Sequence, residues 1–165
     1  MDYKEYLNNV ERKLKSYFDI ERDYDLNGYP LDLYAKHHFR NERYVLSKKF
    51  VVYGQENNEY IFIKYFEEVG EISLKEYIDF LVKSIDILVE PDNDHMSSVI
   101  TGVLLTNHKP KIEVIETIKK FKYHKGFAFG FKGWVDIRLI LVTMDGECIV
   151  TNKKGKEVSS VYCIQ

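Results

Sequence analysis

The sequence is poor in cysteine, proline and tryptophan. Its 165 residues include two cysteines, three prolines and one tryptophan. Cys148 and Cys163 are too few for a disulfide framework, so we expect free thiols in a reducing compartment. A chain of this length buries roughly 68–70% of its extended surface and needs no such cross-links. We therefore expect a single domain over residues 1–165.

The sequence also lacks long apolar runs and an excess of charge of one sign. The longest uncharged run, Ser97–Asn107, is shorter than the roughly 18 residues that a membrane span needs. The amino-terminal segment MDYKEYLNNVERK has no apolar core and does not resemble a signal peptide. A net charge of −2 gives no global attraction to nucleic acid or to an anionic membrane. We expect a cytoplasmic protein that does not bind membranes.

Familiar catalytic motifs are missing as well. The chain has no G-x-S-x-G, P-loop, G-x-G-x-x-G or C-x-x-C pattern. His37 and His38 are adjacent on a predicted strand, point to opposite faces and cannot bind one metal together. The acidic turn Asp92–His95 lacks the glycine and the distal glutamate of an EF-hand loop. We expect no metal and no cofactor, and the sequence favours a non-enzymatic protein.

Aromatic residues, in contrast, are abundant: there are 13 tyrosines and 10 phenylalanines. Such residues favour β-structure. Three consecutive runs alternate apolar and polar residues or are rich in aromatic and β-branched residues, with polar connections at 40–43 and 54–58 that suit antiparallel hairpins. The runs are Leu31–Phe39, Tyr44–Tyr53 and Tyr60–Phe66. They predict a three-stranded meander against which helices pack.

Three segments have the apolar periodicity of helices. Residues Tyr3–Phe18 form an amphipathic pattern, and a second pattern begins at a Ser73–Glu76 capping box and runs to Val89. Pro110 can open a third helix over Lys111–Lys122. Turn residues precede the first predicted strand at Asn27-Gly28.

The remaining segments predict strands. Ser98–Thr106 is continuously apolar, which is typical of a central strand covered on both faces. Gly126–Phe131 alternates phenylalanine with small residues, and Trp134–Met144 is followed by hairpin signals at Asp145-Gly146 and Asn152–Gly155. The prediction is an α+β domain with a mixed, mostly antiparallel sheet. Its element order is α-β-β-β-α-β-α-β-β-β-β, with the helices packed on the sheet and a crossover between residues 98 and 131.

The first half of this order resembles the core of the restriction-endonuclease-like, or PD-(D/E)xK, nucleases. The resemblance covers roughly Tyr3 to Phe131 and implies a metal-dependent nuclease or phosphodiesterase. In that family an aspartate and an acidic-x-Lys triplet hold a divalent metal, so Asp32, Glu59 and Lys64 would be the catalytic residues. Phe62 stands two positions before Lys64, where an oxygen ligand is needed. The resemblance therefore implies a relative that does not cleave.

Residues Lys125–Phe129 match the first five positions of the RNP1 pattern of RNA-recognition motifs. Aromatic rings at such positions stack on unpaired bases. The pattern ends at Gly130, and the segment between Asn107 and Lys125 has no room for the additional strand that the motif needs. Alternation along a structural strand is the alternative explanation.

The most suggestive stretch is Lys109–Trp134, which has seven lysines against two glutamates. Interleaved with aromatic residues, these lysines could form a groove for a polyanion or a single strand. A solvated helix end followed by a core strand is the alternative. The candidate binding residues are Lys119, Lys120, Lys122, Lys125, Phe127, Phe129 and Trp134.

Three hypotheses follow. The first is a binding module whose lysine- and aromatic-rich second half recognises nucleic acid or a protein. The second is the divergent nuclease that uses Asp32, Glu59 and Lys64. The third is a structural subunit whose sheet edge pairs with a second copy in a homodimer. Asp136 and Arg138 share one face of a predicted strand and can form an ordinary ion pair.

Overall fold

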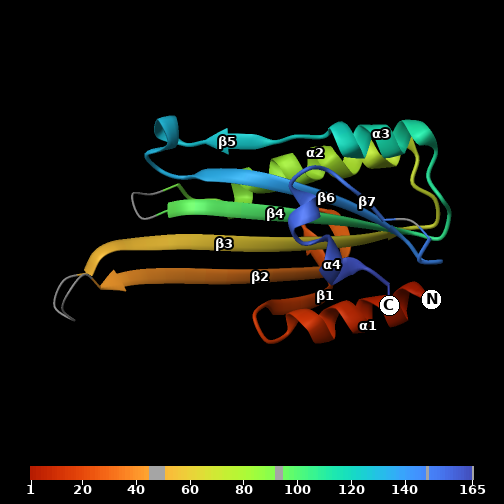
Figure 1. The fold of residues 1–165 in the computed structure, drawn as a ribbon, viewed down its shortest axis with the longest axis horizontal. Helices are drawn as coiled ribbons and strands as arrows, with labels where there is room; N and C mark the ends of the chain where they lie inside the picture. Colours follow the sequence, from red (N-terminus) through yellow and green to blue (C-terminus); the bar gives the residue numbers. More distant parts are fainter. Residues whose placement is uncertain (45–50, 92–94, 148, 165) are drawn as a thin grey trace.

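The computed structural model describes residues 1–44, 51–91, 95–147 and 149–164. Within them, seven strands form one mixed sheet in the order β1-β2-β3-β4-β6-β5, and β7 pairs with β6 beside β5 (Figure 1). The strands are β1 (Asp19–Leu26), β2 (Tyr29–Tyr44), β3 (Val51–Phe66), β4 (His95–Thr106), β5 (His124–Gly126), β6 (Trp134–Thr143) and β7 (Ile149–Thr151). The predicted α+β class is confirmed.

The sheet has a parallel centre and antiparallel borders. Strand β4 pairs in parallel with β3 and with β6, and it is the central strand that its apolar sequence predicts. The β1–β2, β2–β3, β5–β6 and β6–β7 pairs are antiparallel. The order of one helix, three strands, a helix and a strand is present, and the resemblance to restriction-endonuclease-like nucleases stays a prediction.

Helices cover both faces of the sheet. Helices α2 (Glu71–Leu88) and α3 (Ile112–Lys120) pack on one face, where Tyr77, Leu81 and Ile118 are fully buried. Helix α1 (Tyr3–Leu14) and the short α4 (Ser159–Tyr162) pack on the other face. No helix among the described residues is long and apolar enough to cross a membrane.

The predicted hairpins of the meander are displaced along the chain. The first turn is Asn27-Gly28, where φ is 51° and 84°, and asparagine and glycine adopt such positive values more readily than other residues. This turn starts β2 earlier than predicted and adds β1, which the sequence did not predict. The predicted connections 40–43 and 54–58 are wrong, because both are strand and pair with each other. Most of the predicted strand Tyr44–Tyr53 lies outside the described residues.

The start of α2 also differs from its prediction. Gly70 is the N-cap, and Ser73 is the third helical residue, whose hydroxyl oxygen accepts a hydrogen bond of 3.0 Å from the Gly70 N–H. The prediction of a capping box at Ser73–Glu76 is therefore wrong, because the helix begins about one turn earlier. Helices α1 and α3 are shorter than predicted at their carboxyl ends.

The second half of the chain departs further from its prediction. The strand predicted at 126–131 is replaced by β5, which ends at Gly126, and by a 3-10 turn at Ala128–Gly130. Ala128 and Phe129 have positive φ angles of 47° and 56°, which no regular strand has. The last predicted strand is a 3-10 turn at Gly155–Glu157 followed by α4. Cys163 is a free thiol, as expected, and Cys148 lies outside the described residues.

Candidate functional site: a lysine pocket at a gap in the sheet edge

The outer edge of β6 is divided between two short strands. Strand β5 pairs with residues 134–136, and β7 pairs with residues 140–142. Residues 137–139 lie between them and pair with β4 on the inner edge, but have no strand partner on the outer edge. Backbone groups in such a gap need other partners, since buried N–H and C=O groups are almost always hydrogen-bonded.

Asn152 supplies these partners. Its side-chain oxygen accepts hydrogen bonds from Leu139 N–H at 3.1 Å and Gly155 N–H at 2.7 Å, and its amide donates to the Ile137 carbonyl at 3.0 Å. Its backbone N–H also donates to Leu139 O. Asn152 is only 1% exposed. The segment predicted as a hairpin thus closes the gap in the sheet edge with a side chain.

A pocket of about 690 Å³ opens above this gap. One wall is the end of α3 and its connection to β5, and the other wall is the turn after β7. Ile137 and Asn152, both buried, form the bottom. We call this cavity the lysine pocket; it is lined by Lys119, Lys120, Phe121, Lys122, Tyr123, His124, Asp136, Ile137, Asn152, Lys153, Lys154 and Glu157.

Positive charge dominates the lysine pocket. Five lysines line it against two carboxylates, those of Asp136 and Glu157. Lys120 and Lys154 form ion pairs within the protein, Lys120 with Glu116 at 3.0 Å. In the part of the chain that the structure describes, no ion pair involves the three exposed lysines Lys119, Lys122 and Lys153. These three ammonium groups are available to an anionic ligand.

A row of alternating charges runs through the lining of the pocket and along one face of the sheet. Its contacts are Glu59–Arg138 at 3.6 Å, Arg138–Glu157 at 3.0 Å, Glu157–Lys154 at 3.3 Å, Lys154–Asp136 at 3.4 Å and Asp136–His124 at 2.7 Å. The row joins β3, β6, the Gly155–Glu157 turn and β5, which are distant in sequence. His124 is its last member and is exposed to the pocket.

Two members of this row are buried charged residues. Asp136 is 6% exposed and Arg138 8% exposed. Hydrogen bonding by Arg138 lowers the pKa of Glu157, although partial burial works against it, and Lys154 contributes in the same direction. Burial alone would lower the pKa of Lys154, but Glu157 and Asp136 raise it above its usual value. Both groups are therefore held in their charged forms at neutral pH.

Asp136 and Arg138 lie on the same face of β6, as the sequence predicts. Their ion pairs, however, are with residues of other segments, as described above. In the described residues no ion pair joins Asp136 to Arg138. The predicted pair is therefore wrong, and the two side chains instead connect β6 to its neighbours.

The lysines predicted from the sequence are separated by the fold into two groups. Lys119, Lys120 and Lys122 line the lysine pocket. Lys125 lies further along β5, where its ammonium contacts Asp86 at 3.9 Å and lies 5.4 Å from the centre of the Phe127 ring. Lys153 and Lys154 were not predicted from the sequence, because they follow the other pocket lysines by about thirty residues and only the fold brings them together.

The predicted aromatic residues lie at the other end of β5. Phe127 is partly buried against the core, and Trp134 is half-buried at the start of β6. Phe129 and Phe131 are 103% and 86% exposed on the turn between β5 and β6. Because this segment is a 3-10 turn, the RNP1-like prediction of rings on one strand face is wrong. We call residues 127–133 the aromatic loop.

The three predicted nuclease residues do not converge: Asp32 lies beside the Lys64–Tyr65 end of β3, and Glu59 lies further along that strand. The Asp32 carboxylate on β2 accepts a hydrogen bond of 2.7 Å from the Tyr65 N–H. Glu59 and Lys64 are five residues apart on β3, so they point to opposite faces about 17 Å apart along the strand. Within the described residues, no group of three or more His, Cys, Asp or Glu side chains could hold a metal ion. Asp92 and Asp94 lie outside those residues.

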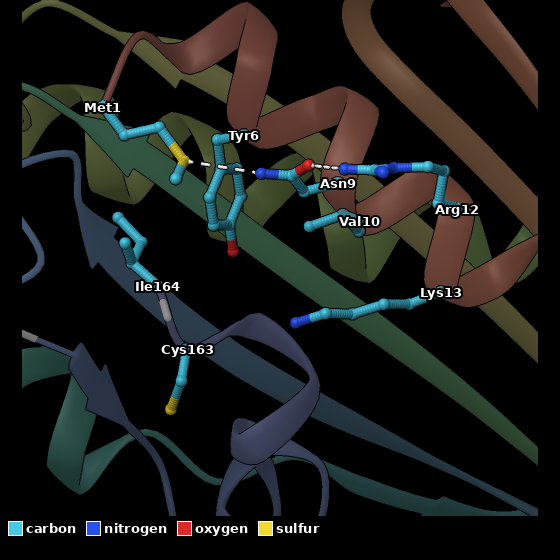
Figure 2. A pocket seen from close by; sticks show the side chains of 8 residues that line it. All are labelled: Met1, Tyr6, Asn9, Val10, Arg12, Lys13, Cys163 and Ile164. Carbon is cyan, nitrogen blue, oxygen red and sulfur yellow. Dashed lines mark hydrogen bonds between the residues drawn. The ribbon is translucent and has the colours of Figure 1, made fainter.

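A second cavity of about 400 Å³ lies between α1 and the carboxyl-terminal segment. Its polar groups are used within the protein: Tyr6 donates to Tyr162 O at 2.7 Å, and Lys13 donates to Val161 O at 2.9 Å. Figure 2 shows that Asn9 lies between Met1 and Arg12 and is hydrogen-bonded to both. These hydrogen bonds join α1 to the carboxyl-terminal segment. Few polar groups of this cavity are therefore left for a ligand.

The fold and the pocket define an α+β domain with a mixed sheet and a basic cavity at one sheet edge. The chain belongs to the family described as Domain of unknown function (DUF8052), whose model matches residues 2–164. No curated protein matches the sequence.

Proposed function

We propose that this domain binds single-stranded nucleic acid through the lysine pocket and the aromatic loop. The observation that carries the proposal is the meeting of Lys119, Lys120 and Lys122 with Lys153 and Lys154 around one cavity. Lysine clusters of this kind bind the phosphate groups of nucleic acids, and these contacts do not distinguish one base sequence from another. Phe121 and Tyr123 in the same wall add apolar and aromatic surface.

The aromatic loop supports a single strand over a duplex. Phe129 and Phe131 expose their rings to solvent, and unpaired bases stack on exposed aromatic side chains at about 1–3 kcal/mol per base. The loop is held by backbone hydrogen bonds, among them Phe127 N–H to Gly133 O at 2.9 Å. Its two non-glycine residues with positive φ are of a kind that concentrates at functional sites.

Strand β5 connects the two parts. His124 lies in the lysine pocket, and Gly126 leads into the aromatic loop. A strand bound with one phosphate in the pocket and its bases on the loop would pass along this short segment. This arrangement predicts a site of several nucleotides, within the range of about 4–16 known for single-strand binding folds.

The test is fluorescence anisotropy with a labelled oligonucleotide of about 12 nucleotides. We expect Lys119→Glu with Lys122→Glu to weaken binding by about tenfold or more, and the affinity of the wild type to fall as salt rises. The matched control is Lys4→Glu with Lys15→Glu, which makes the same charge change in the α1 region on the other face of the sheet. Equal losses in both double variants, or no binding by the wild type, would refute the proposal.

A further inference from the structure

We infer that the lysine pocket receives the terminal phosphate monoester of the bound strand, with His124 among the groups that contact it. The inference rests on the proposed function and specifies which part of the nucleic acid enters the pocket. A phosphate monoester at a strand end carries a charge of about −1.5 to −2 at pH 7. An internal phosphodiester carries only one negative charge.

The distribution of lysines favours a concentrated charge. A groove that follows a backbone needs positive groups spaced along its length, each near one diester. Here five lysines surround a single cavity, and three of them have no ion pair in the described part of the chain. A dianionic group gains more from this arrangement than a monoanionic group, since each ammonium interacts with the full charge.

The lining of the cavity has room for a chain end. Ile137 and Asn152 are its buried residues, and the end of α3 and the Lys153–Lys154 turn supply the lysines. From a terminal phosphate placed among them, the remaining nucleotides can leave along β5 toward the aromatic loop.

His124 has the position and the chemistry to bind such a group. Its Nδ1 contacts the Asp136 carboxylate at 2.7 Å, which orients the ring, and the exposed ring lines the pocket. The charged groups around it are Asp136 on β6, Lys154 and Glu157 beyond β7, and Lys119, Lys120 and Lys122 at the end of α3. A protonated imidazole donates a charge-assisted hydrogen bond to a phosphate oxygen.

The experiment compares four probes at one salt concentration and one pH. Three are oligonucleotides of the same sequence with a 5′-phosphate, a 3′-phosphate or two hydroxyl ends, and the fourth is a nucleoside 5′-monophosphate. We expect one phosphorylated oligonucleotide to bind about tenfold or more tightly than the unphosphorylated one, which corresponds to about 1.4 kcal/mol. His124→Gln and Lys153→Met should each reduce this ratio toward one, while circular dichroism shows that both variants fold.

The outcomes separate the two proposals. Equal affinity for the phosphorylated and unphosphorylated oligonucleotides overturns this inference and leaves the proposed function standing. No binding by any oligonucleotide overturns the proposed function and this inference with it. If the nucleoside monophosphate binds as tightly as the best oligonucleotide, the ligand is not a strand, and the cavity is a mononucleotide pocket. If His124→Gln leaves the ratio of the affinities for phosphorylated and unphosphorylated oligonucleotides unchanged, His124 does not contact the phosphate.

Discussion

His124 and Asp136 are cross-strand partners on β5 and β6, and the Nδ1 of the histidine contacts the Asp136 carboxylate at 2.7 Å. Strand β5 has three residues, and this side-chain contact adds to its backbone pairing with β6. The second carboxylate oxygen of Asp136 lies 3.4 Å from the Lys154 ammonium. One buried carboxylate thereby connects both walls of the lysine pocket.

Replacing Asp136 by asparagine should loosen both walls at a modest cost in stability. Its partners His124 and Lys154 are about half exposed and can be solvated when the charge is lost. We therefore expect the free energy of unfolding in urea to fall by about 1 kcal/mol. Hydrogen exchange should increase at residues 124–126 more than in β4. A loss of several kcal/mol would show instead that the charged row is a principal source of stability.

Asn152→Ala should cost more, because three backbone groups at the gap and in the following turn then lose their side-chain partner. The Leu139 and Gly155 N–H groups and the Ile137 carbonyl lose their hydrogen bonds. Water from the pocket can replace some of them, so we expect a loss of about 2–3 kcal/mol in urea unfolding. A suitable comparison is Asn107→Ala, an exposed asparagine after the end of β4 whose amide donates to the Tyr65 hydroxyl, and for which a small effect is expected. Equal effects of the two substitutions would contradict this assignment of Asn152.

Buried tyrosines should make the fold sensitive to alkali. Burial, helped by the charge of Glu76, raises the pKa of Tyr29 to about 12, and burial raises the pKa of Tyr34 and Tyr77 as well. The folded state therefore retains phenolic protons that the unfolded state loses near pH 10. Stability is fully present below about pH 10 and declines as the pH rises toward these raised values, since hydroxide favours the unfolded chain.

Near-ultraviolet absorbance of the ionised phenol, recorded together with circular dichroism, measures this effect. We expect the phenols of Tyr29, Tyr34 and Tyr77 to ionise only as the structure unfolds. Ionisation of all 13 tyrosines near pH 10 without loss of circular dichroism would contradict the prediction.

The sequence predicted the central elements of the fold well. Apolar residues on one helix face and the continuous apolar run of β4 are signals of burial, and burial is what determines the core. The class, the helices and the central strand followed from such patterns. The boundaries of β2 and β3 did not, because the paired segments 40–43 and 54–58 are polar and were therefore expected to be loops. The backbone pairing of an antiparallel ladder does not depend on apolar side chains.

The candidate site was predictable only in part. The lysines at the end of α3 are close together in sequence, and the excess of charge in Lys109–Trp134 identified them. Lys153 and Lys154 reach the same pocket because Asn152 occupies the gap in β6, which is a tertiary contact without a local signal. Residues 126–131 likewise alternate as a strand does but form a tight turn, in which Ala128 and Phe129 have positive φ. Non-glycine residues give little warning of this conformation.

The division of the β6 edge between two three-residue strands has a consequence for self-association. Neither β5 nor β7 offers a border long enough for another chain to add a strand. At the opposite border, β1 carries Asp19, Glu21, Asp23 and Asp25, and two sheets joined there would bring like charges together. Growth of one sheet across neighbouring molecules is thus opposed along β1, β5 and β7. Strand β2 continues past Lys36, where its pairing with β1 ends, so a homodimer that joins sheet edges would have to use this part of β2.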